Sequence, residues 1–160
     1  MQDFDAIYKV YAPAIYRLCL GYAGEQEMAK DLLQETFISV FSALPGFRGE
    51  SKISTWIYRI ASNKCLRAVE IAGRMPKAEM PVDFPDHEDS SPLEEKHLIL
   101  LRCISSLKES ERLIVSLELE GIPQAEIAAI AGLSEVNVRV KLFRIKDKLK
   151  PMLLRYEQFR

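Results

Sequence analysis

One segment near the C-terminus, Pro123 to Leu149, constrains the fold of this chain more than any other. Its first part repeats apolar residues at a helical period, and the small Ala128 stands where two helices would cross closely. Gly132 follows four residues later and can take a positive φ at a turn without steric cost, and Ser134 is a typical N-cap for the next helix. With the apolar Val138 four residues after that cap, this spacing predicts a helix-turn-helix.

The second helix of this motif carries the charge that DNA binding requires. From Leu133 to Arg155 seven basic residues stand against Glu135 and Asp147, a local net charge of +5, whereas the whole chain has a formal net charge of −1. An apolar stripe faces the first helix at Val138, Leu142, Ile145 and Leu149. The residues turned away from this stripe, and so able to enter a major groove, are Asn137, Val140, Lys141, Arg144 and Lys148. Arg139 and Lys146 lie on a flank that suits phosphates. The alternative is an ordinary helical hairpin with a solvated basic face.

Length and composition limit the rest of the architecture. A chain of 160 residues forms one ordinary domain or two small ones, and 48% hydrophobic residues suffice for a core. No apolar run approaches the ~20 residues of a membrane span and no signal peptide is visible, so we expect a soluble, cytoplasmic protein.

The cysteines and histidines show no pattern of a functional site. Cys19, Cys65 and Cys103 are far apart and lack metal-ligand spacing, which indicates buried thiols in a reducing compartment. His87 and His97 belong to no cluster and are expected at the surface. We therefore expect no metal, no cofactor, no small-molecule substrate and no catalytic residue.

An acidic stretch rich in proline, Ala72 to Pro92, divides the chain. Its net charge is −3, and its prolines and polarity disfavour a packed element. Strand signals are nearly absent elsewhere, whereas helical periods run throughout. We therefore predict an all-α protein of two small helical domains, residues 1–71 and 94–160, joined by a flexible linker over 72–93.

Two amphipathic helices open the first predicted domain. The first runs from Phe4 to Tyr22 and is interrupted at Pro13. Its expected inward residues are Ile7, Val10, Tyr11, Ile15 and Leu18. The second runs from about Glu25 to Leu44, and its expected inward residues are Leu32, Leu33, Phe37, Val40, Phe41 and Leu44.

The opposite arc of that second helix has a different character. It carries Asp31, Gln34, Glu35 and Ile38 at spacings of three and four residues. An exposed isoleucine beside two carboxylates and an amide suits a surface that binds another protein. The alternative is a solvated face with one stray isoleucine.

A third helix, capped by Ser54 or Thr55 and reaching about Ile71, carries an aromatic and basic stripe. The stripe comprises Trp56, Ile60, Asn63 and Arg67, with Arg59 and Lys64 beside it. Rings can stack on bases, amides can read base edges and cations can hold phosphates, so this combination suits single-stranded or distorted nucleic acid. The alternative is that Trp56 belongs to the core.

These segments together resemble a bacterial family, the extracytoplasmic function (ECF) group of sigma-70 factors. The segments similar to regions 2.2, 2.3 and 2.4 are Asp31–Phe37, Phe47–Ser51 and Thr55–Ala61 with Asn63, and the segment similar to region 4 is Leu107–Leu149 with Arg112. The resemblance implies two helical domains and a transcription initiation factor, not an enzyme. Such a factor binds core RNA polymerase and directs it to specific promoters.

The resemblance also implies partners and roles. The region 2.2 helix would bind the β′ clamp of bacterial core RNA polymerase through Asp31, Gln34, Glu35 and Ile38. The region 2.3–2.4 helix would melt the −10 element and capture a base at Asn63, with Trp56, Arg59, Lys64 and Arg67 around it. Region 4, which also meets the β flap, would read −35 duplex through Asn137, Arg139, Lys141, Arg144, Lys146 and Lys148. Control by an anti-sigma factor is expected by analogy.

Some positions depart from the family pattern. Pro123 replaces a common Ser or Thr, Val140 replaces a small polar residue on the groove-facing side, and Glu135 adds an acid at the helix start. These departures bear on −35 specificity at the level of single bases.

Two other protein classes remain as alternatives. A stand-alone DNA-binding regulator would bind duplex tightly without polymerase. A small enzyme with a DNA-binding tail would need a polar constellation within residues 1–71.

Overall fold

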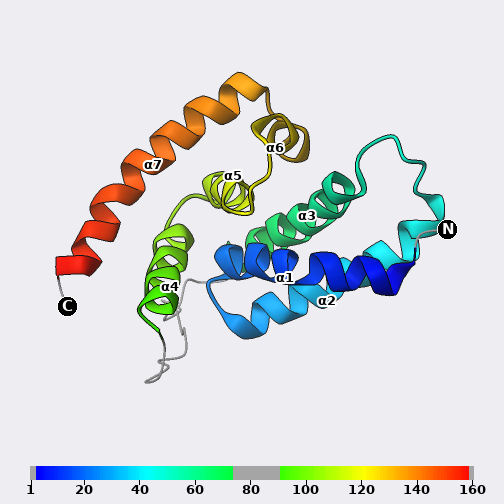
Figure 1. Ribbon diagram of the computed structural model, residues 1–160, viewed down its shortest axis with the longest axis horizontal. Coiled ribbons are helices and arrows are strands. Elements are labelled where there is room, and N and C mark those ends of the chain that lie inside the picture. The colour runs from blue at the N-terminus through cyan, green and yellow to red at the C-terminus, as the bar shows by residue number, and fades with distance from the viewer. Residues whose placement is uncertain (1–2, 74–90, 159–160) are drawn as a thin grey trace.

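The protein is all-helical over the residues that the computed structural model describes, 3–73 and 91–158. Within these ranges it forms seven α-helices, one 3₁₀ helix and no strand, which confirms the all-α prediction (Figure 1). Most of the predicted linker and His87 lie outside the described residues. The two ends of the described chain lie at opposite sides of the molecule (Figure 1).

The first helix, α1 (Phe4–Ala23), begins where the Asp3 carboxylate accepts a hydrogen bond from the Asp5 N–H and ends at Gly24, whose φ is 70°. The expected interruption at Pro13 is wrong, because the helix continues through this exposed proline. A proline removes one backbone hydrogen bond, and the packing of both halves of α1 holds the helix together around that gap. Val10 is also not inward: it is 67% exposed because it falls at the edge of the apolar arc.

The second helix, α2 (Gln26–Ala43), lies along α1 and continues into the 3₁₀ turn η1 (Leu44–Gly46). Phe37 and Val40 are buried as expected. Phe41, by contrast, is 62% exposed, although we expected it in the core. The Phe4 ring at the start of α1 meets the Phe41 ring edge-on, with centroids 5.1 Å apart, and covers it only in part.

The third helix, α3 (Ile53–Gly73), begins before the residues expected to cap it. The Trp56 N–H donates to the Lys52 carbonyl at 3.1 Å, so Ser54 and Thr55 lie inside the first turn rather than at the N-cap. Ile57, Ala61 and Cys65 form the buried stripe of the helix, as helical spacing requires.

The second half comprises α4 (Pro92–Ser105), α5 (Glu109–Leu119), α6 (Gln124–Ala131) and α7 (Glu135–Gln158). The last two helices form the expected helix-turn-helix: Gly132 has a φ of 71°, and the Asn137 N–H donates to the Ser134 hydroxyl at 3.2 Å. Ala128 is buried at the crossing, and the stripe of α7 is buried at Val138, Leu142, Ile145 and Leu149. Pro123 precedes α6 as its N-cap and supplies no side-chain cap.

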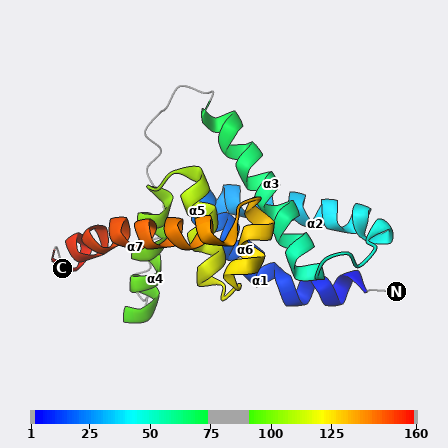
Figure 2. The same cartoon turned by 90° about the horizontal axis from the view of Figure 1, so that it is seen from above.

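The two halves pack directly on each other. Helix α1 contacts α4 and α5, and α3 contacts α6, so that one continuous cluster of buried residues runs through both halves. Figures 1 and 2 both show α6 beside α3, with α7 extending away from the first half. The predicted domain boundaries, with domains at 1–71 and 94–160 and a linker over 72–93, remain a prediction.

Candidate functional site

The outer face of α2 gathers the residues predicted to bind a protein. Asp31, Gln34 and Glu35 are exposed, and Ile38 is 66% exposed. Leu32 and the rest of the buried stripe occupy the opposite side of the helix. This face, called here the α2 face (Asp31, Gln34, Glu35 and Ile38), is therefore an apolar side chain set among two carboxylates and an amide, open to solvent.

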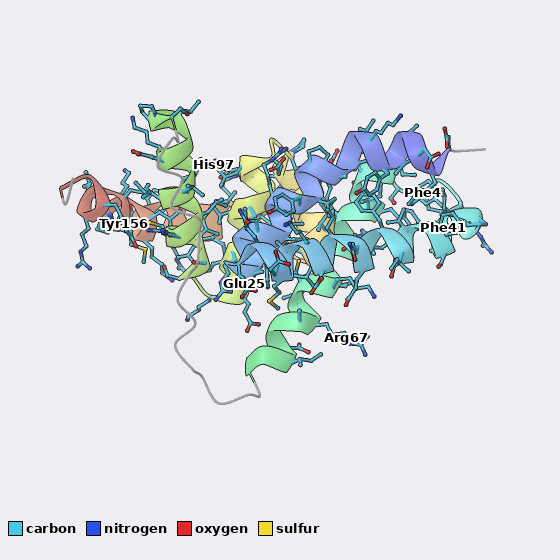
Figure 3. All side chains as sticks on the ribbon, turned by 90° about the horizontal axis from the view of Figure 1, so that it is seen from below. Phe4, Glu25, Phe41, Arg67, His97 and Tyr156 are labelled. Atoms are coloured by element: carbon cyan, nitrogen blue, oxygen red, sulfur yellow. The ribbon has the colours of Figure 1, made fainter. Side chains whose placement is uncertain are left out.

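An apolar cleft at the end of α2 was missed by the sequence reasoning. Its volume is about 900 Å³, and it is lined by Phe4, Phe41, Ser42, Leu44, Pro45, Phe47 and Gly49. Figure 3 shows Phe4 and Phe41 together at this end of the molecule. Phe41 follows Ile38 by three residues, a spacing that could have indicated that the apolar part of the α2 face extends toward the cleft.

The aromatic and basic stripe of α3 is partly covered. Trp56 is half-buried, and its ring packs on the Phe47 ring with centroids 4.9 Å apart. Asn63 and Arg67 are exposed and Lys64 is half-buried. Figure 3 shows Arg67 on the part of α3 that projects from the helical body. Trp56 thus supports the loop before α3 while part of its surface stays accessible.

The helix-turn-helix contacts α3 beside the beginning of this stripe. Arg59 donates from Nε and from Nη2 to the Ala129 carbonyl on α6, each at 3.2 Å, and Lys52 pairs with Glu126 on the same helix. Every residue has a backbone carbonyl, so the identity of Ala129 does not indicate that it accepts these hydrogen bonds. Sequence reasoning therefore could not have found that Arg59 has a partner in the other half.

Further polar contacts join α1 to α5. Arg17 and Glu120 form a bidentate pair with both N–O distances at 2.7 Å, and the hydrogen bond to Glu120 raises the pKa of Arg17. The Tyr22 hydroxyl donates to the Glu109 carbonyl at 2.9 Å, and burial raises the pKa of Tyr22, which keeps this donor protonated. Arg112, singled out by the region 4 resemblance, donates to the carbonyls of Tyr22 and Leu107 at 3.0 and 2.7 Å.

The exposed face of α7 holds the residues predicted to read duplex DNA. Asn137, Arg139 and Arg144 are exposed and Lys141 is half-buried. Lys146 and Lys148 are engaged within the same half, with Glu118 at 3.3 Å and Glu111 at 2.5 Å. The six residues are therefore not equivalent, since these two lysines also tie α7 to α5.

The cysteines and the described histidine lie apart from these surfaces. Cys19 and Cys65 are buried with their sulfurs 3.9 Å apart, and the hydrogen bond between the thiols, with burial, raises the pKa of Cys65. Cys103 is buried as expected, and His97 is exposed. No group of three potential metal ligands occurs among the described residues. None of the helices in the described part of the chain is long and apolar enough to span a membrane.

Comparison with known proteins matches this arrangement of helices to two modules. The family model of Sigma-70 region 2 matches residues 7–74, which include the α2 face and all of α3. The family model of Sigma-70 region 4 matches residues 97–149, which include the helix-turn-helix. The two matches together span well over half of the chain.

Individual proteins agree with this result. The chain is 36% identical over 145 residues to the ECF RNA polymerase sigma-E factor of Salmonella typhimurium, covering 78% of this chain and 75% of that protein. The fold is similar to the sigma factor RpoE of Bartonella quintana, solved in complex with the anti-sigma factor NepR, with a TM-score of 0.80 at 19% identity over 96% of this chain and 98% of that one. It is also similar to CnrH, solved with the cytosolic domain of CnrY, with a TM-score of 0.71 at 22% identity over 94% of this chain and 86% of that one.

A region 2 match followed by a region 4 match, with a relative 36% identical over 78% of the chain, establishes the family. The chain therefore belongs to the ECF sigma factors of the sigma-70 family, and it is a transcription initiation factor of RNA polymerase and not an enzyme.

Proposed function

We propose that this chain binds the β′ clamp of core RNA polymerase through the α2 face, acting in the cytoplasm. The observation that carries the proposal is the exposure of Ile38 between Asp31, Gln34 and Glu35, on a helix whose other side is buried. Basic groups on a partner would pair with the two carboxylates around an apolar contact. The Phe41 cleft lies next along the same helix and extends the apolar area available to that partner.

The two DNA elements are assigned to two helices. Helix α3 would melt the −10 element and capture an unstacked base, with Asn63 reading its edge and Arg59, Lys64 and Arg67 holding phosphates beside Trp56. Helix α7 would lie in the major groove of the −35 element, where Asn137, Lys141 and Arg144 meet base edges and Arg139, Lys146 and Lys148 meet phosphates. The β flap would hold this second half on the polymerase.

If α3 binds the −10 element while α7 binds the −35 element, the two halves must separate. The −35 and −10 elements are some 25 positions apart, or roughly 85 Å of duplex at 3.4 Å per base pair. Arg59 and Ala129, which belong to the −10 and −35 halves, are instead in direct contact at 3.2 Å. We therefore assign the closed arrangement to the protein before promoter binding, with opening on the polymerase.

Control by an anti-sigma factor follows from the same surfaces. The similar sigma factor RpoE of B. quintana was solved with the anti-sigma factor NepR. In this chain, a protein that covers the α2 face would compete with the polymerase for Asp31 and Glu35. One that wedges the two halves apart in an unproductive arrangement would act on the contacts between α3 and α6.

Binding to core RNA polymerase tests the proposal. The full-length protein is mixed with core enzyme, and co-elution on gel filtration is measured for wild type and for Asp31→Arg with Glu35→Arg. The matched control, Glu70→Arg with Asp147→Arg, makes the same change in net charge at two exposed positions outside α2. We expect wild type and control to bind and the α2 variant to fail while keeping its helical circular dichroism.

Two results would contradict the proposal. If the α2 variant still binds, the α2 face is not the polymerase surface. If folded wild-type protein does not bind core enzyme but binds duplex DNA tightly by itself, it acts as a stand-alone regulator.

A further inference from the structure

The solvent-facing centre of the recognition helix is apolar in its first two turns. Val136 is 63% exposed and Val140 is 43% exposed, and they lie one turn apart on the same side of α7. The buried stripe that contains Val138 and Leu142 lies on the opposite side. Because the first turns of a recognition helix approach the base edges most closely, these two valines occupy the part of α7 that would face the floor of the groove.

Exposed cations flank this apolar centre, which the acid Glu135 precedes and the 70% exposed Phe143 extends. Arg139 and Arg144 are exposed and Lys141 is half-buried, and none of the three forms an ion pair with another described residue. Lys146 and Lys148, farther along the helix, are paired with acids of α5. Unpaired cations on the flanks of an exposed apolar strip are complementary to a polyanion that presents an apolar group between its phosphates.

The major groove offers one such apolar group, the C5-methyl of thymine. A valine has no donor or acceptor, so it cannot satisfy the N4 amino group of cytosine or the O6 of guanine, and either would lose its water without a replacement. A methyl group, in contrast, gains by leaving water. Valines at these positions therefore favour thymine over cytosine and guanine.

We propose that Val140, together with Val136, contacts thymine methyl groups in the −35 element and so determines part of the promoter specificity of this sigma factor. The inference rests on the proposed reading of the −35 element by α7, and it names the base that this helix selects. A methyl group fully removed from water on binding contributes about fourfold in affinity.

The experiment uses holoenzyme assembled from core RNA polymerase and the full chain. Duplexes randomised over the −35 and −10 regions are incubated with it, and the bound fraction is sequenced to obtain a preferred promoter. Each −35 thymine of that promoter is then replaced in turn by deoxyuridine, which removes only the methyl group, and affinity is measured by competition. Deoxyuridine at thymines outside both elements controls for general effects of the base.

We expect at least one −35 thymine whose replacement lowers the affinity of wild-type holoenzyme about fourfold. In Val140→Ala or in Val136→Ala with Val140→Ala, this sensitivity should fall to less than twofold. The matched control Leu154→Ala truncates another exposed apolar residue, 57% exposed, near the far end of α7, and should keep wild-type sensitivity.

Three outcomes would overturn the inference, and they have different meanings. If the selected promoter has a −35 preference but replacement of none of its −35 thymines lowers the affinity, Val136 and Val140 do not contact thymine methyl groups. The proposed function of α7 is not affected by this result. Loss of core binding by the valine variants would show that the apolar centre binds polymerase instead of DNA. A selected pool without any −35 preference overturns both the inference and the proposed function of α7.

Discussion

Arg59 on α3 donates two hydrogen bonds, each 3.2 Å long, to the carbonyl oxygen of Ala129 on the first helix of the helix-turn-helix. Arg59, which we propose to hold −10 DNA, is thereby hydrogen-bonded to the half of the protein that we propose to bind −35 DNA. Lys52 pairs with Glu126 beside it, and Arg17 pairs with Glu120 across α1 and α5. The contacts between the halves thus include two ion pairs whose cations remain accessible to solvent while their acids are largely covered, which makes them sensitive to salt and to charge reversal.

Reversing the acidic partners should open the protein. In Glu120→Arg with Glu126→Arg, two ion pairs across the halves are replaced by like-charge contacts with Arg17 and Lys52. We expect a larger radius of gyration by small-angle X-ray scattering than for wild type, most clearly at low salt. The control Glu135→Arg with Asp147→Arg makes the same change in charge on exposed α7 positions and should stay as compact as wild type.

Replacing Asn63 should affect promoter opening alone. The residue is exposed on α3, so Asn63→Ala should change the free energy of unfolding by no more than about 0.5 kcal/mol. We expect normal affinity for core polymerase and weaker permanganate reactivity of the melted −10 bases. A large drop in melting temperature would identify Asn63 as a structural residue instead.

Arg144 and Arg139 should differ in their effects on −35 binding. Arg144 faces the groove, so Arg144→Ala should weaken binding to the preferred −35 sequence by ~1–3 kcal/mol and relax the preference for one base pair. Arg139 lies on the flank of the same helix, so Arg139→Ala should weaken binding to all duplexes about equally and reduce the salt dependence. Competition binding with duplexes that carry single base-pair substitutions measures both effects. If the two variants lose affinity in the same way, Arg144 and Arg139 do not have different roles.

The turn of the helix-turn-helix should require glycine. Gly132 has a φ of 71° and open space around its Cα, so in Gly132→Ala the cost is backbone strain without a clash, about 1–2 kcal/mol. The matched control is Gly46→Ala, also with open space but without a positive φ, and its stability should hardly change. Chemical denaturation of both variants measures the difference.

The ion pair between Glu111 and Lys148 should stabilise α7 in a pH-dependent way. Burial favours the protonated form of Glu111, but the hydrogen bond and charge of Lys148, with the Lys108 N–H, outweigh it and hold the pKa below its ordinary value of 4.5. A lowered folded pKa means that the stabilisation is present above 4.5 and is lost as the pH falls through the folded value.

Comparison of wild type with Glu111→Gln measures this contribution. Because Lys148 remains 46% exposed, the difference in unfolding free energy at pH 7 should stay below about 1 kcal/mol. It should shrink when melting is repeated below pH 4. A difference that grows at low pH would show that another carboxylate dominates this region.

The local features of the candidate surfaces were accessible from sequence. Helical periodicity places Ile38 opposite Leu32 and Val140 opposite Val138, and the structure confirms that each pair divides into one exposed and one buried residue. Gly132 and Ser134 mark the turn because their backbone and capping preferences are local. Periodicity failed at the edges of the apolar arcs, where Val10 and Phe41 are exposed, since coverage there depends on how far a neighbouring helix reaches.

The amino-acid sequence by itself determined the all-helical class, the helix-turn-helix and the family, because these depend on residue identities at short spacings. Only the tertiary structure decided that the two halves close on each other, that Arg59 contacts Ala129, and that Lys146 and Lys148 turn back to acids of α5. The cleft beside Phe41 is likewise a product of packing. The physical reason is that these features join residues distant in the chain, some through backbone atoms that every residue shares, so no local pattern encodes them.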